Sequence, residues 1–315
     1  NLGTILLKAG KLKEAEKSTR RAIQINSNFA EAFSNLGNIM RELGNNKEAE
    51  IYLKKAIEIN PSLDVAYSNL GNTLKDIGNL EEAENYQRKA IELNPKFAIA
   101  YYNLGDILFN KNKLKEAEKY TRKAIKYNPN FSDAFANLGL ILKEIGKTEE
   151  ALNSLLEAIR IDPNRSNNYC LITIIIRDSD SSRISKDKLK HILEILFKRD
   201  DINHTILFKA FYNIYNDLIT SINTKSSSLF NDRSFQKLIN DKLFLNAMKK
   251  IIFQDIGLEN ILTKARRELS NLISLNEEIK SKSYIEFIYS LAEQCFINEY
   301  IYSLNKDDYK NISII

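Results

Sequence analysis

The sequence predicts an all-α protein: a row of stacked helical hairpins followed by a helical region that does not repeat. Three observations support this fold class. Glycines recur every 34 residues, at Gly3, Gly37, Gly71, Gly105 and Gly139. Two columns of alanine recur with the same period, beginning at Ala15 and Ala22. All four prolines share the register: Pro61, Pro95, Pro129 and Pro163. A fixed period of this length is typical of solenoid proteins.

Each period is predicted to begin with a helix, which in the second copy runs from about Ala32 to Leu43. Phe33, Leu36 and Met40 recur at helical spacing and form its apolar face. Gly44 follows as the C′ residue, where a positive φ is common. Other copies have glycine at the same place, and Asn112 replaces it in the fourth copy.

The second helix of the same copy is predicted from about Lys47 to Ile59. Ala49, Leu53 and Ala56 lie on its inward face. Proline cannot continue a helix, so Pro61 marks the turn into the next copy. Gly37 and Ala49 have almost no side chain, so we expect the two helices of a hairpin to approach closely there.

This pattern resembles the tetratricopeptide repeat (TPR) over residues 1–166, as about five repeats of which the first is truncated. The resemblance rests on the aromatic column Phe33, Tyr67, Tyr101 and Phe135, followed by Leu-Gly and then by the Ala, Ala and Pro columns. The family implies a right-handed superhelix, an α-solenoid with a concave groove lined by the first helices. Because Asn1 aligns with Asn35, we expect the natural protein to extend N-terminally.

Beyond Pro163 the register fades. Residues 167–200 are interpreted as a degenerate sixth hairpin or cap, with Leu189, Ile192, Leu193 and Leu196 facing inward. Residues 201–315 are predicted to be all helical. The expected helices span 204–222, 235–252, 258–274 and 283–303, with a loop over 223–234. Gly257 is the one glycine after Gly146, so we expect no phosphate-cradling loop and no cofactor.

A second resemblance concerns this C-terminal region. Two runs, Asp255-x-x-Leu258-Glu259-x-x-Leu262-x-x-x-Arg266 and Gln294-Cys295-Phe296-x-Asn298-Glu299-Tyr300, look like the helical connector of bacterial proteins that join TPR repeats to a methyltransferase. The resemblance implies that this chain is the non-catalytic part of a larger transferase. For Asn298 and Glu299 we favour a structural role, a buried polar pair, over contact with a further domain.

Composition limits the other function classes. Lys+Arg 46 against Asp+Glu 41 gives a net charge of +5, and the charges are interleaved, so nucleic-acid binding is not predicted. The sequence has no apolar run of about 18 residues, so no membrane span is expected. His191 and His204 lack partners at metal-ligand spacing and predict neither a metal site nor a catalytic centre. Glu81-Glu82 and Glu149-Glu150 fit helix N-termini.

The two cysteines, Cys170 and Cys295, lie 125 residues apart and form no C-x-x-C motif. A pair this distant is more often two buried thiols than a disulfide or a metal site. We therefore expect a reducing compartment, the cytoplasm.

The candidate site is an asparagine column on the predicted groove side of the first helices. A carboxamide has one acceptor and two donors, so it can bind the backbone of an extended peptide without reading side chains. The column resembles the asparagine ladder of the O-linked GlcNAc transferases. The predicted groove residues are Asn35, Asn38, Asn69, Asn72, Asn103, Asp106, Asn137, Tyr102 and Phe109.

The alternative is that these asparagines fix a neighbouring backbone or are simply solvated. The columns that flank them, represented by Ser34 and Glu31, contain no lysine or arginine, so a clamp for peptide carboxylates is not expected. Ile99, Tyr102 and Phe109 are expected to form an apolar patch near the middle of the groove. The sequence thus predicts a non-catalytic scaffold that binds a protein or peptide partner, the recruiting half of a transferase being the alternative.

Overall fold

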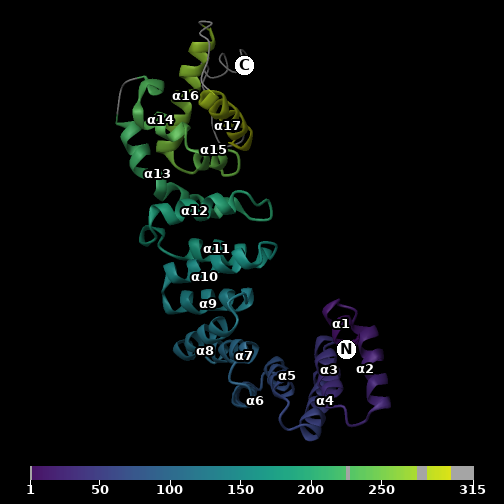
Figure 1. Cartoon of the computed structure of the whole chain (residues 1–315). Coiled ribbons are helices and arrows are strands. Elements are labelled where there is room, and N and C mark those ends of the chain that lie inside the picture. The colour runs from purple at the N-terminus through teal and green to yellow at the C-terminus, as the bar shows by residue number, and fades with distance from the viewer. Residues whose placement is uncertain (1, 225–227, 275–281, 299–315) are drawn as a thin grey trace. The chain divides into compact units, whose positions relative to one another are not determined.

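The computed structural model describes the chain except residues 1, 225–227, 275–281 and 299–315 (Figure 1). The described residues form helices and loops without β-strands. They divide into two compact units, residues 1–168 and 169–315. None of their helices has the length and apolarity needed to cross a bilayer.

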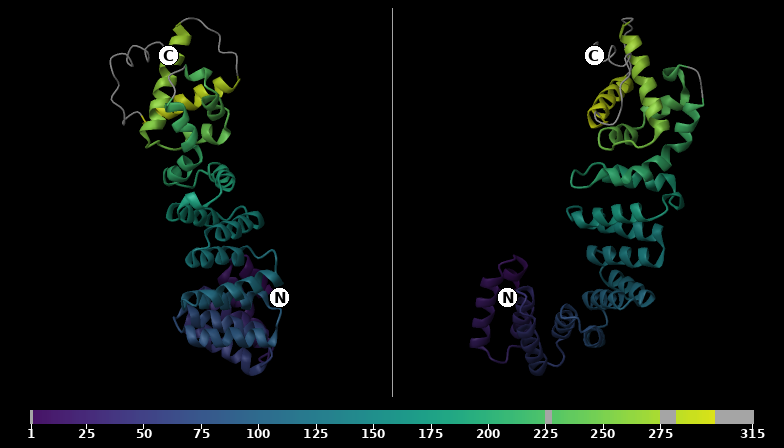
Figure 2. Two further views of the ribbon diagram at one scale, coloured as in Figure 1. Left: turned by 90° about the vertical axis from the view of Figure 1, so that its left-hand side faces the viewer. Right: turned by 180° about the vertical axis from the view of Figure 1, so that it is seen from behind.

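The first unit consists of five hairpins in sequence order, each packed on the next (Figure 2). Their first helices are α1 (Leu2–Lys8), α3 (Ala30–Glu42), α5 (Asp64–Asp76), α7 (Ala98–Asn110) and α9 (Ser132–Ile145). Their second helices are α2 (Leu12–Ile25), α4 (Asn46–Ile59), α6 (Leu80–Leu93), α8 (Leu114–Tyr127) and α10 (Thr148–Ile161). The predicted α-solenoid is confirmed.

The first helices end, as predicted, at residues in the left-handed backbone conformation. Gly44 has φ +81°, and Asn112, at the equivalent place after α7, has φ 56°. In each case the next residue donates a backbone hydrogen bond back to the helix, as Asn45 does to the Met40 carbonyl at 2.8 Å. This bonding is typical of a Schellman cap and turns the chain sharply into the second helix.

Close approach within a hairpin also follows the prediction. A Cβ added to Gly37 would lie 2.5 Å from Cγ of Leu53, which is fully buried. Leu36, Met40 and Ala49 are buried around it. The absence of a side chain at Gly37 therefore leaves space for Leu53, which lies one helical turn after Ala49.

The two kinds of helix form two layers. Each first helix contacts the first helices of adjacent hairpins, α3 with α5 and α5 with α7, for example. Among the described residues no pair of second helices has a contact of similar extent. The first helices therefore lie closer together and form the inner layer.

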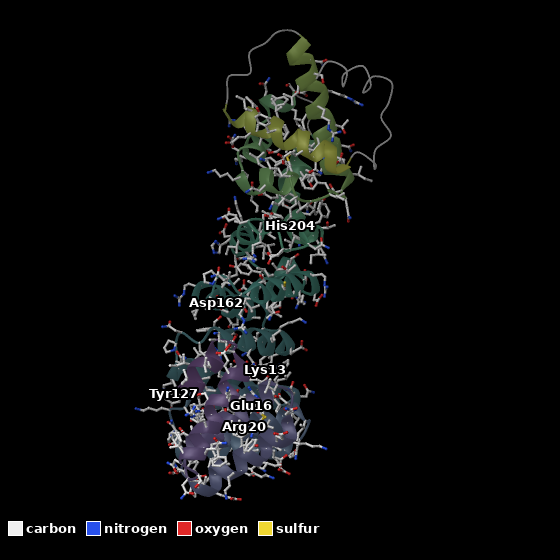
Figure 3. All side chains as sticks on the ribbon, turned by 90° about the vertical axis from the view of Figure 1, so that its right-hand side faces the viewer. Lys13, Glu16, Arg20, Tyr127, Asp162 and His204 are labelled. Carbon is white, nitrogen blue, oxygen red and sulfur yellow. The ribbon has the colours of Figure 1, made fainter. Side chains whose placement is uncertain are left out.

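Hydrogen bonds from arginines connect neighbouring second helices in the outer layer. Glu16 and Arg20 pair at 2.8 Å on α2 (Figure 3), and Arg20 also donates to the hydroxyl of Tyr52 on α4 at 2.9 Å. Arg88 repeats this arrangement with Glu84 and with Tyr120 on α8. These residues hold neighbouring second helices together through polar contacts.

The second unit begins within α11 (Ser166–Asp178) and has no 34-residue period. Its remaining elements are η1 (Ser181–Arg183), α12 (Lys186–Leu196), η2 (His204–Leu207), α13 (Phe208–Asn223), η3 (Leu229–Asn231), α14 (Arg233–Ile239), α15 (Lys242–Met248), α16 (Ile256–Ser274) and α17 (Lys282–Asn298). Leu189, Ile192, Leu193 and Leu196 are buried as predicted. The assignment of 167–200 as a separate cap stays a prediction.

An aromatic cluster forms the core of this unit. The rings of Phe211 and Phe253 stack with centroids 5.5 Å apart, and Phe244 lies 6.0 Å from Phe211. Tyr215 completes the cluster and is buried with them. The cluster joins α13, α15 and the segment before α16, which are far apart in the sequence.

Two sequence expectations are wrong. The helix predicted over 235–252 is two helices, α14 and α15, because Asp241 accepts a hydrogen bond from the Leu243 N–H at 2.9 Å and starts a new helix there. Cys170 is exposed rather than buried, because α11 buries the neighbouring Tyr169 and Ile172 instead. Cys295 lies outside the residues whose side chains are described.

Candidate functional site

The inner layer presents an open face centred on α5 and α7. Val65 and Ile99 occupy equivalent positions in the first turns of these helices, and their side chains are 40% and 50% exposed. They lie one period apart on neighbouring helices. Exposed aliphatic side chains at equivalent positions form a strip that runs across the helices.

Asparagines on this face bridge neighbouring first helices. The Asn69 amide donates to the Ser34 hydroxyl at 3.3 Å, and the Asn103 amide donates to the Ser68 hydroxyl at 3.1 Å. Both serines are buried. Each of these asparagines thereby uses one amide hydrogen, while its carbonyl oxygen accepts no hydrogen bond from the described residues. Bridging explains part of the column, and it leaves the carbonyl oxygens of Asn69 and Asn103 without a partner among the described residues.

Asn103 and Asn137 are both almost fully buried, at 8% and 9% exposed, but Asn137 has a different partner. It donates to the Asp106 carboxylate at 3.4 Å, while Lys75 pairs with the other oxygen of Asp106 at 2.8 Å. The Asn137 oxygen is buried without a partner among the described residues. Asn137 and Asp106 therefore belong mainly to the contact between α7 and α9.

Asn38 and Asn72, which lie one helical turn after Asn35 and Asn69, form a second asparagine column, and both are half-buried. The carboxamide oxygen of Asn72 accepts a hydrogen bond from Gln87 of α6 at 3.0 Å. Asn38 occupies the equivalent position on α3, next to Asn35, and both are half-buried. The structure thus places both columns on the first helices, and whether they contact a peptide stays a prediction.

Tyr102 lies one helical turn after Ile99 on α7 and is half-buried. Its ring lies 5.0 Å from that of Phe131. Burial, together with the nearby charges of Asp106 and Asp133, raises the pKa of Tyr102 to about 12. Phe109 lies near the other end of α7 and packs partly against Leu104 and Leu108.

Sequence reasoning missed a column of cations at the last turn of the first helices. Arg41 pairs with Glu42 at 2.5 Å and lies 3.9 Å from Asp76 on the next helix. Lys75 pairs with Asp106, and Lys143 lies 3.5 Å from Glu144. Arg41 and Lys75 are one 34-residue period apart, and Lys143 lies two periods after Lys75, so the sequence contained a signal for this column, although Phe109 interrupts it. Carboxylates of the protein thus lie beside each of these cations.

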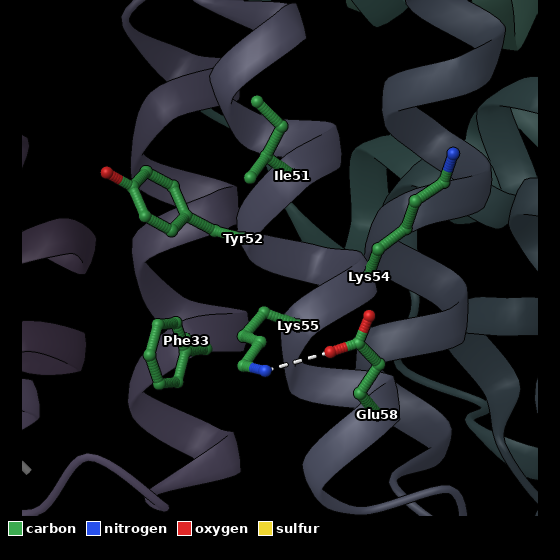
Figure 4. Close-up of a pocket in the computed structure, with 6 residues that line it drawn as sticks. All are labelled: Phe33, Ile51, Tyr52, Lys54, Lys55 and Glu58. Atoms are coloured by element: carbon green, nitrogen blue, oxygen red, sulfur yellow. Dashed lines mark hydrogen bonds and ion pairs between the residues drawn. The ribbon is translucent and has the colours of Figure 1, made fainter.

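A hollow of about 410 Å³ lies over α4 in the outer layer (Figure 4). Phe33, Ile51 and Tyr52 form its apolar part. Lys54, Lys55 and Glu58 border it, and Lys55 pairs with Glu58 at 2.9 Å. Five of these six residues belong to α4, so the hollow is separate from the inner face and from its asparagines.

The first C-terminal sequence run forms part of α16. The Asp255 carboxylate accepts from the Leu258 N–H at 2.8 Å and caps the helix, and Leu258 and Leu262 are buried. Glu259 and Arg266 lie 3.7 Å apart. The run therefore starts and packs a helix. Asn298, Glu299 and Tyr300 of the second run lie outside the residues whose side chains are described.

Tetratricopeptide-repeat family models match residues 1–29, 28–96, 98–131 and 120–153. A comparison of the sequence with curated proteins gives no match. Among solved structures, the TPR protein TTC0263 of Thermus thermophilus is 20% identical with a TM-score of 0.51, over 56% of this chain and 95% of that chain. Cut9 with Hcn1, from the APC/C, is 18% identical with a TM-score of 0.55, over 66% of this chain and 41% of that chain.

YrrB, a TPR protein with an unusual peptide-binding site, is 27% identical over 53% of this chain and 87% of that chain, with a TM-score of 0.41. The matches with TTC0263 and with Cut9 and Hcn1 show the fold alone. The family models, together with the hairpins, show that residues 1–153 consist of tetratricopeptide repeats.

Proposed function

We propose that the inner face of α5 and α7 binds an extended segment of a protein partner, and that the chain acts as a non-catalytic scaffold. The observation that carries the proposal is the combination of exposed Val65 and Ile99 with asparagines whose amide groups are only partly used. Apolar contacts supply free energy on binding, and carboxamides satisfy the backbone polar groups that binding removes from water.

An extended backbone suits this face better than a terminal carboxylate. Carboxylates of the protein occupy Arg41 and Lys75, so a peptide carboxylate would have to displace them. The asparagines are neutral and have both donors and acceptors, which match the N–H and C=O groups of a peptide. Their recurrence favours a ligand that crosses several hairpins.

The test of this proposal is titration of the chain with unstructured peptides selected from a displayed random library. We expect Ile99→Ser to weaken binding about tenfold, because it removes an exposed aliphatic contact. Ile51→Ser is the matched control, since Ile51 is 65% exposed on α4 in the outer layer. Equal losses from both variants would contradict the assignment of the inner face.

The asparagines need a separate variant. We expect Asn69→Ala combined with Asn103→Ala to lower peptide affinity about tenfold or more. Asn85→Ala, an exposed asparagine on α6, is the control. Unchanged affinity in the double variant would show that the column serves only to join the helices.

The alternative, a recruiting half for a transferase that lies outside these residues, rests on the sequence resemblance. In α16 the residues of that resemblance cap and pack a helix. The proposed peptide-binding face would serve a scaffold and a recruiting module in the same way.

A further inference from the structure

Gln87 is an unusual residue for its place in the repeat. It lies on α6 at the position that faces the glycine of the first helix, here Gly71. The equivalent residues of the other hairpins are Thr19, Leu53, Thr121 and Leu155. Gln87 is fully buried, so all of its hydrogen bonds are formed without competition from water.

The side-chain amide of Gln87 forms three hydrogen bonds. Its nitrogen donates to the Ser68 backbone carbonyl at 2.8 Å and to the Asn72 carboxamide oxygen at 3.0 Å. Its oxygen accepts from the Ser68 hydroxyl at 3.0 Å. The Ser68 hydroxyl in turn accepts from the Asn103 amide at 3.1 Å. One buried side chain of the outer layer thus connects two asparagines of the inner face.

One group fixes the direction of the whole chain of bonds. The Ser68 backbone carbonyl can only accept, so the Gln87 atom facing it must be the nitrogen. The Gln87 oxygen then takes the single hydrogen of the Ser68 hydroxyl, which leaves that hydroxyl to accept from Asn103. The second hydrogen of the Gln87 nitrogen requires an acceptor, so Asn72 must turn its oxygen inward.

These hydrogen bonds determine which polar atoms of Asn72 and Asn103 point towards the inner face of α5 and α7. Asn72 keeps both of its amide hydrogens, and Asn103 keeps its carbonyl oxygen, without partners among the described residues. Asn103 is only 8% exposed, but its oxygen and the Asn72 amide nitrogen are not among the fully buried, unpartnered polar atoms of the described residues, so both atoms keep some contact with the surface. A donor for a peptide C=O and an acceptor for a peptide N–H are therefore held in fixed orientations on α5 and α7.

We infer that Gln87 is a positioning residue for the peptide backbone, which rests on the peptide-binding function proposed above. It does not touch the peptide. It prevents the Asn72 and Asn103 amides from rotating end for end, so that the donor and acceptor are already oriented when the peptide arrives. Orientation before binding raises affinity because less freedom is lost in the complex.

The test combines Gln87→Met with peptides that contain an ester in place of one peptide N–H. Met keeps the length of the side chain and removes its amide. With the wild-type chain, an ester at the contact position is expected to cost about tenfold in affinity. With Gln87→Met, binding of the all-amide peptide is expected to fall about tenfold, and the ester is expected to cost clearly less. A merely structural role of Gln87 would lower affinity for both peptides equally.

Thr121→Leu is the matched control. Thr121 occupies the same column on α8 and is buried, its hydroxyl has no partner among the described residues, and leucine already stands in this column at Leu53 and Leu155. This variant should leave peptide affinity and the ester effect unchanged. The inference would be overturned if Gln87→Met bound the peptide with full affinity while Asn103→Ala weakened binding. The proposed function would still hold in that case. If the wild-type chain bound no peptide, the proposed function and the inference about Gln87 would both be wrong.

A measurement on the wild-type chain keeps the inference testable if Gln87→Met does not fold. The Gln87 side-chain amide protons should exchange slowly with solvent, because the group is buried and both hydrogens are bonded. Nuclear magnetic resonance can follow them directly. Fast exchange of these protons would contradict a fixed network.

Discussion

The two units of the chain bury different kinds of side chain. In the first unit, small and aliphatic residues recur in columns, and each hairpin packs on its neighbours in the sequence. In the second unit, the aromatic cluster of Phe211, Phe244 and Phe253 joins elements far apart in the sequence. A repeating core distributes stability over nearest-neighbour contacts, whereas a single cluster concentrates it at one place. A destabilising substitution in the first unit should therefore affect mainly its own hairpin and the adjacent ones. A substitution in the aromatic cluster should destabilise the whole second unit.

The largest expected effect comes from the aromatic cluster. Phe244→Ala should destabilise the second unit by about 3–5 kcal/mol, because it leaves a cavity among rings that cannot collapse onto it. Chemical denaturation should show an early transition of this unit, with the transition of the repeats unchanged. Tyr289→Ala, at a residue 66% exposed on α17, should change stability by less than about 0.5 kcal/mol. Loss of both transitions together would contradict separate cores.

Glu84 tests the polar contacts of the repeats. Burial alone would raise the pKa of Glu84, but hydrogen bonds from Lys111 and Arg88 outweigh it and hold the pKa below its ordinary value of 4.5. The unfolded chain therefore binds a proton more readily. The stabilisation is present above pH 4.5 and is lost as the pH falls through the folded-state pKa.

Glu84→Gln should accordingly lower stability at neutral pH by about 1.5–3 kcal/mol, because charged hydrogen bonds become neutral ones. Below about pH 4 the difference between wild type and variant should shrink. Unfolding in denaturant over a pH series measures both effects. A difference that does not depend on pH would show that the Glu84 charge is not the source of the stabilisation.

Gly37 tests the close approach within a hairpin. Gly37→Val should cost about 1–3 kcal/mol, because a Cβ there would lie 2.5 Å from the buried Leu53 side chain. The combination with Leu53→Ala should recover part of this loss, since it removes the clashing atoms. If the double variant lost as much stability as the two single variants together, the glycine would have a function other than avoiding the clash with Leu53.

The smallest expected effect concerns Asn112. Asn112→Gly should raise the stability of the repeats by about 0.5–1 kcal/mol, because glycine adopts the positive φ of 56° without a Cβ penalty. Thermal unfolding is sensitive enough to detect this change. Gly146→Ala, at φ 87° after α9, should give a change of opposite sign. Destabilisation by Asn112→Gly would mean that the Asn112 side chain has a contact that outweighs the strain.

The sequence was sufficient for the hairpins, their caps and their inward columns, because each depends on residues within about one period. Gly44 and Asn112 end helices by their own backbone preferences, and Leu36 and Leu53 are placed by helical spacing alone. The break at Asp241 was missed because a helical run of apolar residues concealed a local N-cap. Aromatic residues of the second unit could be assigned to helices, but their partners could not be named.

The amino-acid sequence by itself determined a solenoid of tetratricopeptide repeats and the positions of its asparagine columns. The tertiary structure alone decided what those asparagines do within the fold. Asn69 and Asn103 donate to serines 35 residues earlier, and Gln87 reaches Ser68 and Asn72 from the outer layer. The direction of a carboxamide depends on which donors and acceptors surround it in space. A repeat pattern places the residue but contains no information about those partners.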